Sequence, residues 1–391
     1  MPRLADKRFI LLLIAIIVLP LMCSRYRTLT AQQSRSRKTR PSATSQRQKS
    51  TPTPSPTPVR SLLDLLGEPP PLPPPPKPTK TEPEFNPGDV IKVETTEVML
   101  PVTVRDSSGR LVSDLTRDAF RVFEDNQEQP LRDLALRQVP VDAVLMVDTS
   151  SSTARNLDDF RRAAEGFADR LGPDDRISLM KFDDTVQLLQ DWTKSRFQLR
   201  RALTRIAPGM FTRFNDALLL AAHEQYGSAQ SRRAVIVLTD GIDSGRGATL
   251  QSAFRALLEA QVTVYVVSNT EISRAAKQSE LESLRSGTDS ARRFNQLQID
   301  GLEMELRALD QSEVLLEQLT SATGGRLYKP HSFNSLESTY AEVADELRHQ
   351  YALYYMPLNK NRDGSFRRVR VETTNPVYHP LTRVGYFAPR S

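Results

Sequence analysis

Val144-Leu-Met-Val-Asp-Thr-Ser-Ser-Ser152 is an apolar run that ends in a carboxylate and continues into hydroxyl side chains. In extended backbone, side chains two positions apart point the same way. Asp148, Ser150 and Ser152 are therefore expected to direct three oxygens toward one point. Oxygen ligands with a single negative charge suit a divalent cation such as Mg²⁺. The same residues could instead cap the helix that follows, so other loops must distinguish the two interpretations.

Strands and helices alternate on both sides of this stretch. Residues 144–147, 235–238 and 262–267 are continuous apolar runs, as expected for strands buried on both faces. Residues 177–182 and 186–192 read as a hairpin at one edge. Helical periodicity covers five segments: 154–171, 195–206, 214–226, 249–260 and 334–349. The pattern predicts an α/β fold with a doubly wound, mainly parallel, Rossmann-like sheet over residues 140–349.

Two more polar loops lie where ligands bind in such sheets, near the carboxyl ends of strands. Thr212 opens a helix and Asp216 follows four residues later. Asp240 follows a buried strand, and Gly241 permits a sharp turn there. Asp243 is either a neighbouring acceptor or a solvated acid. Asp216 could also be a first-turn acid favoured by the helix dipole.

The segments that flank this unit have β character. Residues 89–139 and 350–391 contain short alternating runs, and we expect them to pair into one small sheet or sandwich. Asp363-Gly364 is a hairpin signal between runs at 351–356 and 367–373.

The N-terminal region resembles an export signal followed by a linker. Within residues 1–24, basic residues precede a 15-residue apolar run, which is short for a membrane span and suits a signal peptide or an anchor. Residues 25–88 are first basic and then proline-rich, which predicts a disordered spacer. The basic part could adhere to an anionic membrane. Four leucines in the linker could form one docking turn: Leu62, Leu63, Leu65 and Leu66.

The overall basic charge does not describe the folded part. The chain has 391 residues and a net charge of +6, but residues 1–60 contribute +11 and leave residues 61–391 at −5. We therefore expect no nucleic-acid partner. Cys23 is the only cysteine, so neither an intrachain disulfide nor a cysteine-based zinc site can form. The four histidines show no ligand spacing.

Three motifs together resemble one known family. Asp148-x-Ser150-x-Ser152, Thr212-(x)3-Asp216 and Thr239-Asp240-Gly241 occur in the order typical of von Willebrand factor type A (VWA) domains. The flanking segments are similar to a VWA-related family of exported bacterial proteins. Two features depart from the family pattern. Met210-Phe211 stands where small residues are usual, and residues 270–318 are longer than expected.

The resemblance implies a metal-ion-dependent adhesion site. In that site Ser150, Ser152 and Thr212 would contact Mg²⁺ or Mn²⁺ directly, while Asp148 and Asp240 would bind it directly or through water. Largely neutral ligands leave one position for an Asp or Glu of a partner protein. The helical 270–318 insertion either forms a wall or lid beside the site or is a solvated hairpin.

These observations favour a binding module that is exported to the periplasm or cell envelope, with its N-terminal segment either cleaved or kept as a membrane anchor. A structural scaffold with an unused metal site is the alternative. A metal-assisted hydrolase is less favoured, because the sequence has no hydrolase motif and no histidine near the acidic loops. We therefore expect no enzymatic activity.

Overall fold

The computed structural model describes residues 61–62, 97–136, 139–150, 153, 156–225, 231–245 and 247–390. The expectations for residues 1–24 and for almost all of the 25–88 linker lie outside these ranges. None of the helices in the described part has the length and apolar character needed to cross a membrane.

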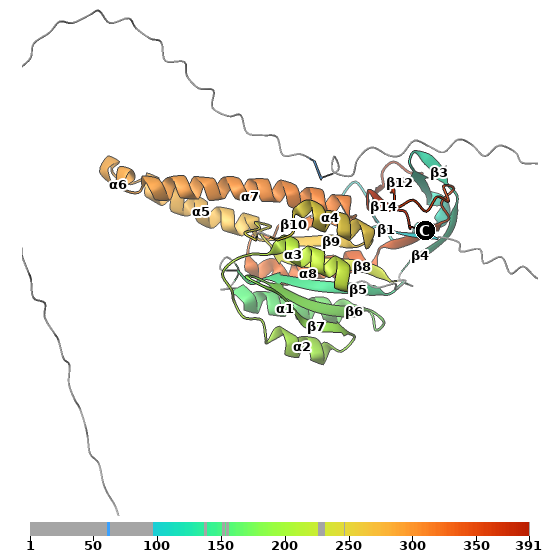
Figure 1. Cartoon of the computed structure of the whole chain (residues 1–391), viewed down its shortest axis with the longest axis horizontal. Helices are drawn as coiled ribbons and strands as arrows, with labels where there is room; N and C mark the ends of the chain where they lie inside the picture. Colours follow the sequence, from blue (N-terminus) through green and yellow to red (C-terminus); the bar gives the residue numbers. More distant parts are fainter. Residues whose placement is uncertain are drawn as a thin grey trace, which may run out of the picture. The chain divides into compact units, whose positions relative to one another are not determined.

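A six-stranded sheet forms the centre of the protein (Figure 1). Its order is β10-β9-β8-β5-β6-β7, and all neighbours are parallel except β6 and β7. In spatial order the strands are Leu327–Tyr328, Thr263–Ser268, Arg232–Thr239, Val141–Asp148, Arg176–Phe182 and Val186–Thr193. The expected parallel sheet and its edge hairpin are both confirmed. Because β5 lies between β8 and β6, the strand order reverses beside Asp148, the position where open α/β sheets bind ligands.

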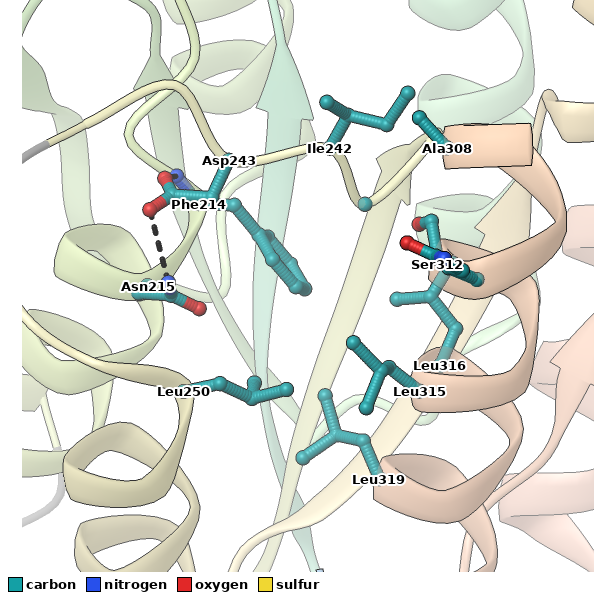
Figure 2. A pocket seen from close by; sticks show the side chains of 12 residues that line it. Phe214, Asn215, Ile242, Asp243, Leu250, Ala308, Ser312, Leu315, Leu316 and Leu319 are labelled. Carbon is teal, nitrogen blue, oxygen red and sulfur yellow. Dashed lines mark hydrogen bonds between the residues drawn. The ribbon is translucent and has the colours of Figure 1, made fainter. Parts of the chain in front are cut away.

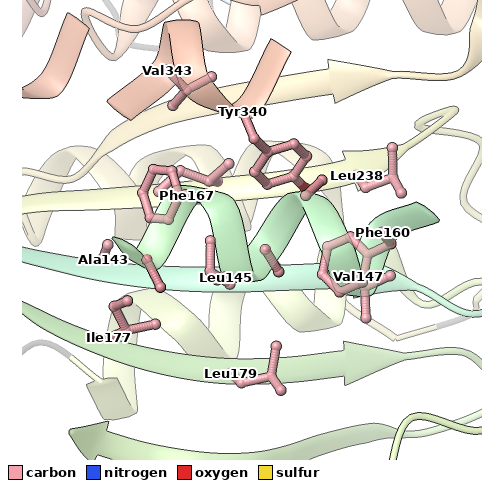
Figure 3. Packing of buried hydrophobic residues seen from close by; sticks show 14 of the residues in the cluster. Ala143, Leu145, Val147, Phe160, Phe167, Ile177, Leu179, Leu238, Tyr340 and Val343 are labelled. Atoms are coloured by element: carbon pink, nitrogen blue, oxygen red, sulfur yellow. The ribbon is translucent and has the colours of Figure 1, made fainter. Parts of the chain in front are cut away.

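Helices cover both faces of the sheet. Successive β5 side chains point to opposite sides and are buried on both, so each face needs a layer of helices. One face packs against α1 (Leu157–Arg170), α2 (Arg196–Leu203) and α8 (Leu336–Arg348). Figure 3 shows Phe160 and Phe167 of α1 meeting Tyr340 of α8 above Leu145.

The opposite face of the sheet is covered by α3 (Phe214–Leu220), α4 (Leu250–Glu259) and α7 (Gln296–Ala322). Val144 and Met146 of β5 point into this second core. The doubly wound architecture is therefore confirmed.

The flanking segments form a β-sandwich around a third core. One sheet has the order β13-β1-β11-β4 and the other β14-β12-β2-β3. In the first sheet these strands are His379–Leu381, Val98–Arg105, Tyr351–Tyr355 and Leu131–Leu136. In the second they are Gly385–Phe387, Phe366–Thr373, Phe120–Glu124 and Gln127–Gln129. Both sheets combine strands from the two segments: β1 and β4 pair with β11 in the first sheet, and β2 pairs with β12 in the second, which confirms that the two segments fold together.

The hairpin expected at Asp363-Gly364 is wrong. β11 and β12, the strands on either side of it, belong to different sheets. Both edges of β11 are already occupied by β1 and β4, so the chain must cross to the other sheet. Gly364 has a positive φ of 69° as the turn signal suggested, but Asp363 bridges to Arg390 near the C-terminus instead of closing a tight turn.

The 270–318 insertion is a long helical hairpin that projects from the sheet (Figure 1). It consists of α5 (Thr270–Arg285), α6 (Asp289–Phe294) and the first part of α7. Leu281 of α5 packs against Ile299 and Leu302 of α7. The hairpin is thus held by its own small apolar core.

Leu62 of the linker docks onto this unit. It is 3% exposed and belongs to the core on the α4 and α7 side, and its amide donates a hydrogen bond to Gln318 Oε1 at 3.0 Å. The expected docking turn is thus supported for Leu62, while Leu63, Leu65 and Leu66 lie outside the described residues.

A buried carboxylate joins the sandwich to the central unit. Glu346 of α8 is fully buried, and its Oε2 accepts hydrogen bonds from Arg105 of β1 at 2.5 Å and from the Tyr328 hydroxyl at 3.0 Å. Since an unpaired charge is costly in an apolar interior, these contacts fix β1 against the last helix.

Replacing Glu346 by Gln should therefore lower the free energy of unfolding by about 3 kcal/mol, because Arg105 loses its counter-charge in a largely buried position. Urea denaturation measures the change. The matched control is Glu342→Gln, an exposed acid on the same helix, which should change stability by less than about 0.5 kcal/mol. Equal effects of the two substitutions would contradict the buried ion pair.

Candidate metal site

Asp148 lies at the centre of the candidate site. It is the last residue of β5 and is fully buried. Its Oδ1 accepts a hydrogen bond from the Ser150 amide at 2.9 Å, and its Oδ2 accepts one from the Thr239 hydroxyl at 3.0 Å. Because both oxygens are held by residues of neighbouring strand ends, the carboxylate has one fixed orientation.

The electrostatics of this carboxylate are unfavourable without a cation. Burial, as the largest cause, and the nearby negative charge of Asp240 together raise the pKa of Asp148 to about 7, against the opposing effect of the hydrogen bonds from Ser150 and Thr239. Asp148 and Asp240 thus lie close enough to repel each other. A divalent cation between them would remove this repulsion.

Of the hydroxyl residues, Ser150 contacts Asp148 directly. Ser150 and Thr212 are both buried. The Thr212 amide donates to Ser244 Oγ at 2.8 Å and its carbonyl accepts from the Ser244 amide at 2.9 Å. These two hydrogen bonds join the loop before α3 to the loop after β8. Ser152 lies outside the described residues. The roles of these side chains as metal ligands stay predictions.

Among the residues that the structure describes, no group of three or more His, Cys, Asp or Glu side chains could hold a metal ion. A cation at this edge would therefore depend on hydroxyl oxygens in addition to Asp148 and Asp240. Such a donor set fits Mg²⁺ or Mn²⁺, which prefer oxygen ligands.

Asp216 braces the loop after β8. Its Oδ1 accepts a hydrogen bond from the Ala248 amide at 2.6 Å, and its carboxylate lies 3.6 Å from Arg213. A Cβ at Gly247 would lie 2.2 Å from this carboxylate, so a larger residue there would push Asp216 away from the Ala248 amide.

Asp243 has a similar bracing role. It accepts hydrogen bonds from the Phe214 amide at 2.9 Å and from Asn215 Nδ2 at 2.8 Å, at the start of α3. The loop after β8 is therefore tied to α3 from both sides, by Asp216 and by Asp243.

The sequence predicts Asp183-Asp184 only as a hairpin turn, but Asp183 is also a buried acid under the first loop. It accepts hydrogen bonds from Lys181 Nζ at 2.5 Å and from the Thr149 hydroxyl at 2.8 Å. Burial opposes its charged form, but the hydrogen bonds from Lys181, Thr185 and Thr149 lower its pKa. The available signal was Lys181 itself, because a cation in the buried part of a strand needs an acidic partner.

The Asp240 loop rests on the insertion. The Ser312 hydroxyl of α7 donates to the Asp240 carbonyl at 2.5 Å. Gly241 has a φ of 72°, and a Cβ on it would lie 2.6 Å from Ser312 Oγ. The base of the helical hairpin therefore supports one of the two acids of the site, which favours the wall interpretation for this part of the insertion.

A pocket of about 260 Å³ opens between α7, α3 and α4 next to this loop (Figure 2). Phe214, Ile242 and Leu250 form one side, and Leu315, Leu316 and Leu319 of α7 form the other. Asp243 and Asn215 are hydrogen-bonded to each other at its rim. The interior of the pocket is mainly apolar.

Stability at different pH values tests the electrostatics of Asp148. Its pKa of about 7 lies above the ordinary value of 3.8, so the folded state holds more protons than the unfolded state between these values. The free energy of unfolding of the metal-free protein should therefore fall as the pH rises from 4 to 7. In Asp148→Asn this contribution, roughly 2–4 kcal/mol, should disappear.

Urea unfolding of both proteins in EDTA, from pH 4 to pH 8, measures the difference. Other titrating groups affect both proteins alike, so the gap between the two curves isolates Asp148. A constant gap across this range would contradict the raised pKa.

Comparisons with known proteins agree with this geometry. Residues 143–242 match the sequence profile of the von Willebrand factor type A domain. No curated protein matches the chain.

Several solved structures are similar in fold. Proximal thread matrix protein 1 from the mussel byssus, described as having a zinc-occupied MIDAS motif, is 16% identical, with a TM-score of 0.41 over 56% of this chain and 48% of that one. A von Willebrand factor type A protein from Catenulispora acidiphila is 11% identical, with a TM-score of 0.42 over 77% and 75%. An aerotolerance-related membrane protein from Bacteroides fragilis is 16% identical, with a TM-score of 0.37 over 53% and 99%.

The chain spans about half the length of the mussel protein. The profile match covers β5 and β8 together with the loops that hold Asp148, Thr212 and Asp240, which are the elements that build the candidate site. The chain therefore contains a von Willebrand factor type A domain, the family to which residues 143–242 belong.

Proposed function

We propose that this protein is a metal-dependent binding module that captures an acidic side chain of a partner protein. The observation that carries the proposal is the buried Asp148 carboxylate, held in one orientation beside the like charge of Asp240. Mg²⁺ or Mn²⁺ would sit between these acids, with hydroxyl ligands from Ser150, Ser152 and Thr212.

The chemistry of these ligands explains why a partner carboxylate would bind. Mg²⁺ takes six oxygen ligands in octahedral geometry and often keeps some of its water. Hydroxyl ligands contribute no charge, so the ion stays electrophilic toward an incoming Asp or Glu. Met210 and Phe211, 72% and 60% exposed, flank Thr212 and offer apolar contact area for the same partner.

A binding role is favoured over hydrolysis because the neighbouring acids already have structural partners. Asp183 is bonded to Lys181 and Thr149, Asp216 to Ala248, and Asp243 to the start of α3. A metal-assisted hydrolase would need a positioned general base beside the metal-bound water.

We further propose that the domain acts outside the cytoplasm, tethered or released through its N-terminal segment. The 15-residue apolar run after Arg3, Lys7 and Arg8 supports export. The proline-rich linker would then hold the domain away from the membrane.

Loss of the hydroxyl of Thr212 should weaken metal binding. Thr212→Ala removes one oxygen ligand without changing the backbone contacts to Ser244, and should reduce Mg²⁺ affinity at least tenfold. Thr212→Ser keeps the hydroxyl and should bind within about threefold of the natural protein. Isothermal titration calorimetry measures both affinities. Equal affinities of the Ala and Ser variants would remove Thr212 from the ligand set.

Partner capture should depend on the metal and on Asp148. We expect a pull-down from a cell-envelope fraction to retain a partner with Mg²⁺ and to lose it with EDTA or in Asp148→Ala. The matched control is Asp174→Ala, an exposed acid at the opposite end of the neighbouring strand β6, which should behave like the natural protein.

Other outcomes would favour the rival functions. Absence of any Mg²⁺ or Mn²⁺ heat and of any rise in melting temperature would support an unused metal site on a structural scaffold. Metal-dependent turnover of ester, phosphate or peptide substrates that is lost in Asp148→Ala would support a hydrolase.

A further inference from the structure

α7 carries apolar residues on two opposite faces. One face packs on α5 and on the core through Ile299, Leu302, Leu309 and Leu316. The other face, named here the outer stripe, consists of six positions: Leu297, Gly301, Met304, Ala308, Gln311 and Leu315. At 100° per residue the two sets point about 140° apart.

The outer stripe has the spacing of a coiled-coil seam. Its members follow one another at intervals of four, three, four, three and four residues, which is a heptad repeat. Leu297 is 88% exposed and Met304 is 65% exposed, while a Cβ at Gly301 would meet nothing within 4 Å. None of the six positions is charged, although a quarter of the residues in the chain are charged. Such a seam without a partner helix is unusual on a solvated surface.

Two copies of the outer stripe can pair in antiparallel orientation with complementary side chains at each level. In an antiparallel pair of two such helices, Leu297 of one copy lies opposite Leu315 of the other. Gly301 then lies opposite Gln311, and Met304 opposite Ala308. A small residue thus faces a larger one at the inner levels, which allows side chains to interdigitate.

The ends of the hairpin also match. Phe294, 89% exposed, lies at the tip three residues before Leu297. In the antiparallel register it reaches the level of Gln318, beside the pocket lined by Leu315, Leu319 and Leu250 (Figure 2). The pocket volume of about 260 Å³ is below the range of roughly 300–1,000 Å³ that holds drug-sized ligands, and suits one or two large apolar side chains.

Several charged residues of the helical hairpin pair between α5 and α7 and do not lie over the outer stripe. Glu303 pairs with Arg285 and Glu305 pairs with Lys277, both across to α5. Arg274 pairs with Asp310 and Glu313 in the same way. These ion pairs stabilise the hairpin internally. The helical hairpin carries both acidic and basic residues, so its charge does not favour binding to an anionic lipid surface.

We propose that the outer stripe of α7 binds the outer stripe of a second copy of this chain, antiparallel, with Phe294 and Leu297 of each copy entering the pocket of the other. The interface is isologous, because each contact occurs twice about a two-fold axis. Ser312 and Leu316 contact the Asp240 loop within each copy, so this support of the loop does not require pairing. The inference does not depend on metal binding.

Disulfide trapping tests the register. The full-length chain with Cys23→Ser contains no cysteine, so single cysteines can be introduced. A mixture of Gly301→Cys and Gln311→Cys chains should form a mixed disulfide dimer under mild oxidation. Each variant alone should not, because equivalent residues in the antiparallel pair are about 15 Å apart. The pairing is antiparallel only if Leu297→Cys alone also fails to cross-link, because a parallel seam would join the two copies of that residue.

Sedimentation equilibrium tests the interface itself. The natural chain should be dimeric at micromolar concentration, and Leu297→Glu together with Met304→Glu should raise the dimer dissociation constant roughly a hundredfold. The matched control is Leu188→Glu, an apolar residue of β7 that is 45% exposed and lies outside α7, and it should leave the dimer intact. Circular dichroism confirms that each variant is folded.

The possible outcomes are distinct. A monomeric natural chain at these concentrations, or equal effects of the stripe and control substitutions, would overturn the proposal. A dimer that survives both stripe substitutions would show that another surface pairs the copies. Mg²⁺ affinity, measured on the same variants, should stay unchanged, so failure here leaves the proposed metal function untouched.

Discussion

The candidate site depends on the repulsion between two carboxylates at one edge of the sheet. Asp148 is fully buried, and the charge of Asp240 nearby makes its ionised form costly. A protein interior tolerates such a pair only when a proton or a cation compensates for the charge. Both oxygens of Asp148 accept hydrogen bonds, from Ser150 and Thr239, which favours the ionised form of the carboxylate. An ionised carboxylate in a fixed orientation is suited to binding a cation.

The loops around this pair are held by other acids with different roles. Asp183 lies under the first loop, Asp216 holds the loop after β8, and Asp243 joins that loop to the start of α3. Each of these carboxylates accepts hydrogen bonds from backbone amides or from side chains of a neighbouring loop. The candidate site therefore consists of two acids that repel each other and three acids that hold the loops in place.

The insertion and the sandwich connect this edge to the rest of the chain. Ser312 of α7 supports the Asp240 carbonyl, and Leu62 of the linker contacts the same helix through Gln318. On the other side, Glu346 ties α8 to β1 of the sandwich. Ser312 and Gln318 both lie on α7, so one helix contacts the Asp240 loop and the linker.

The sequence by itself determined the α/β architecture, the sandwich made from both flanks, and the placement of Asp148 and Asp240 at neighbouring strand ends. These features follow from local rules, since buried parallel strands are continuously apolar and their carboxyl ends meet at one edge. Only the tertiary structure separated Asp216 and Asp243, which brace loops, from the acids of the site, because hydrogen-bond partners that are distant in sequence decide those roles. It also identified Asp183 as buried and sent the chain at Gly364 across to the second sheet, since both edges of β11 were already occupied. The outer stripe of α7 was present in the sequence as spacing, but only the packing of α5 on the opposite face left it without a partner helix.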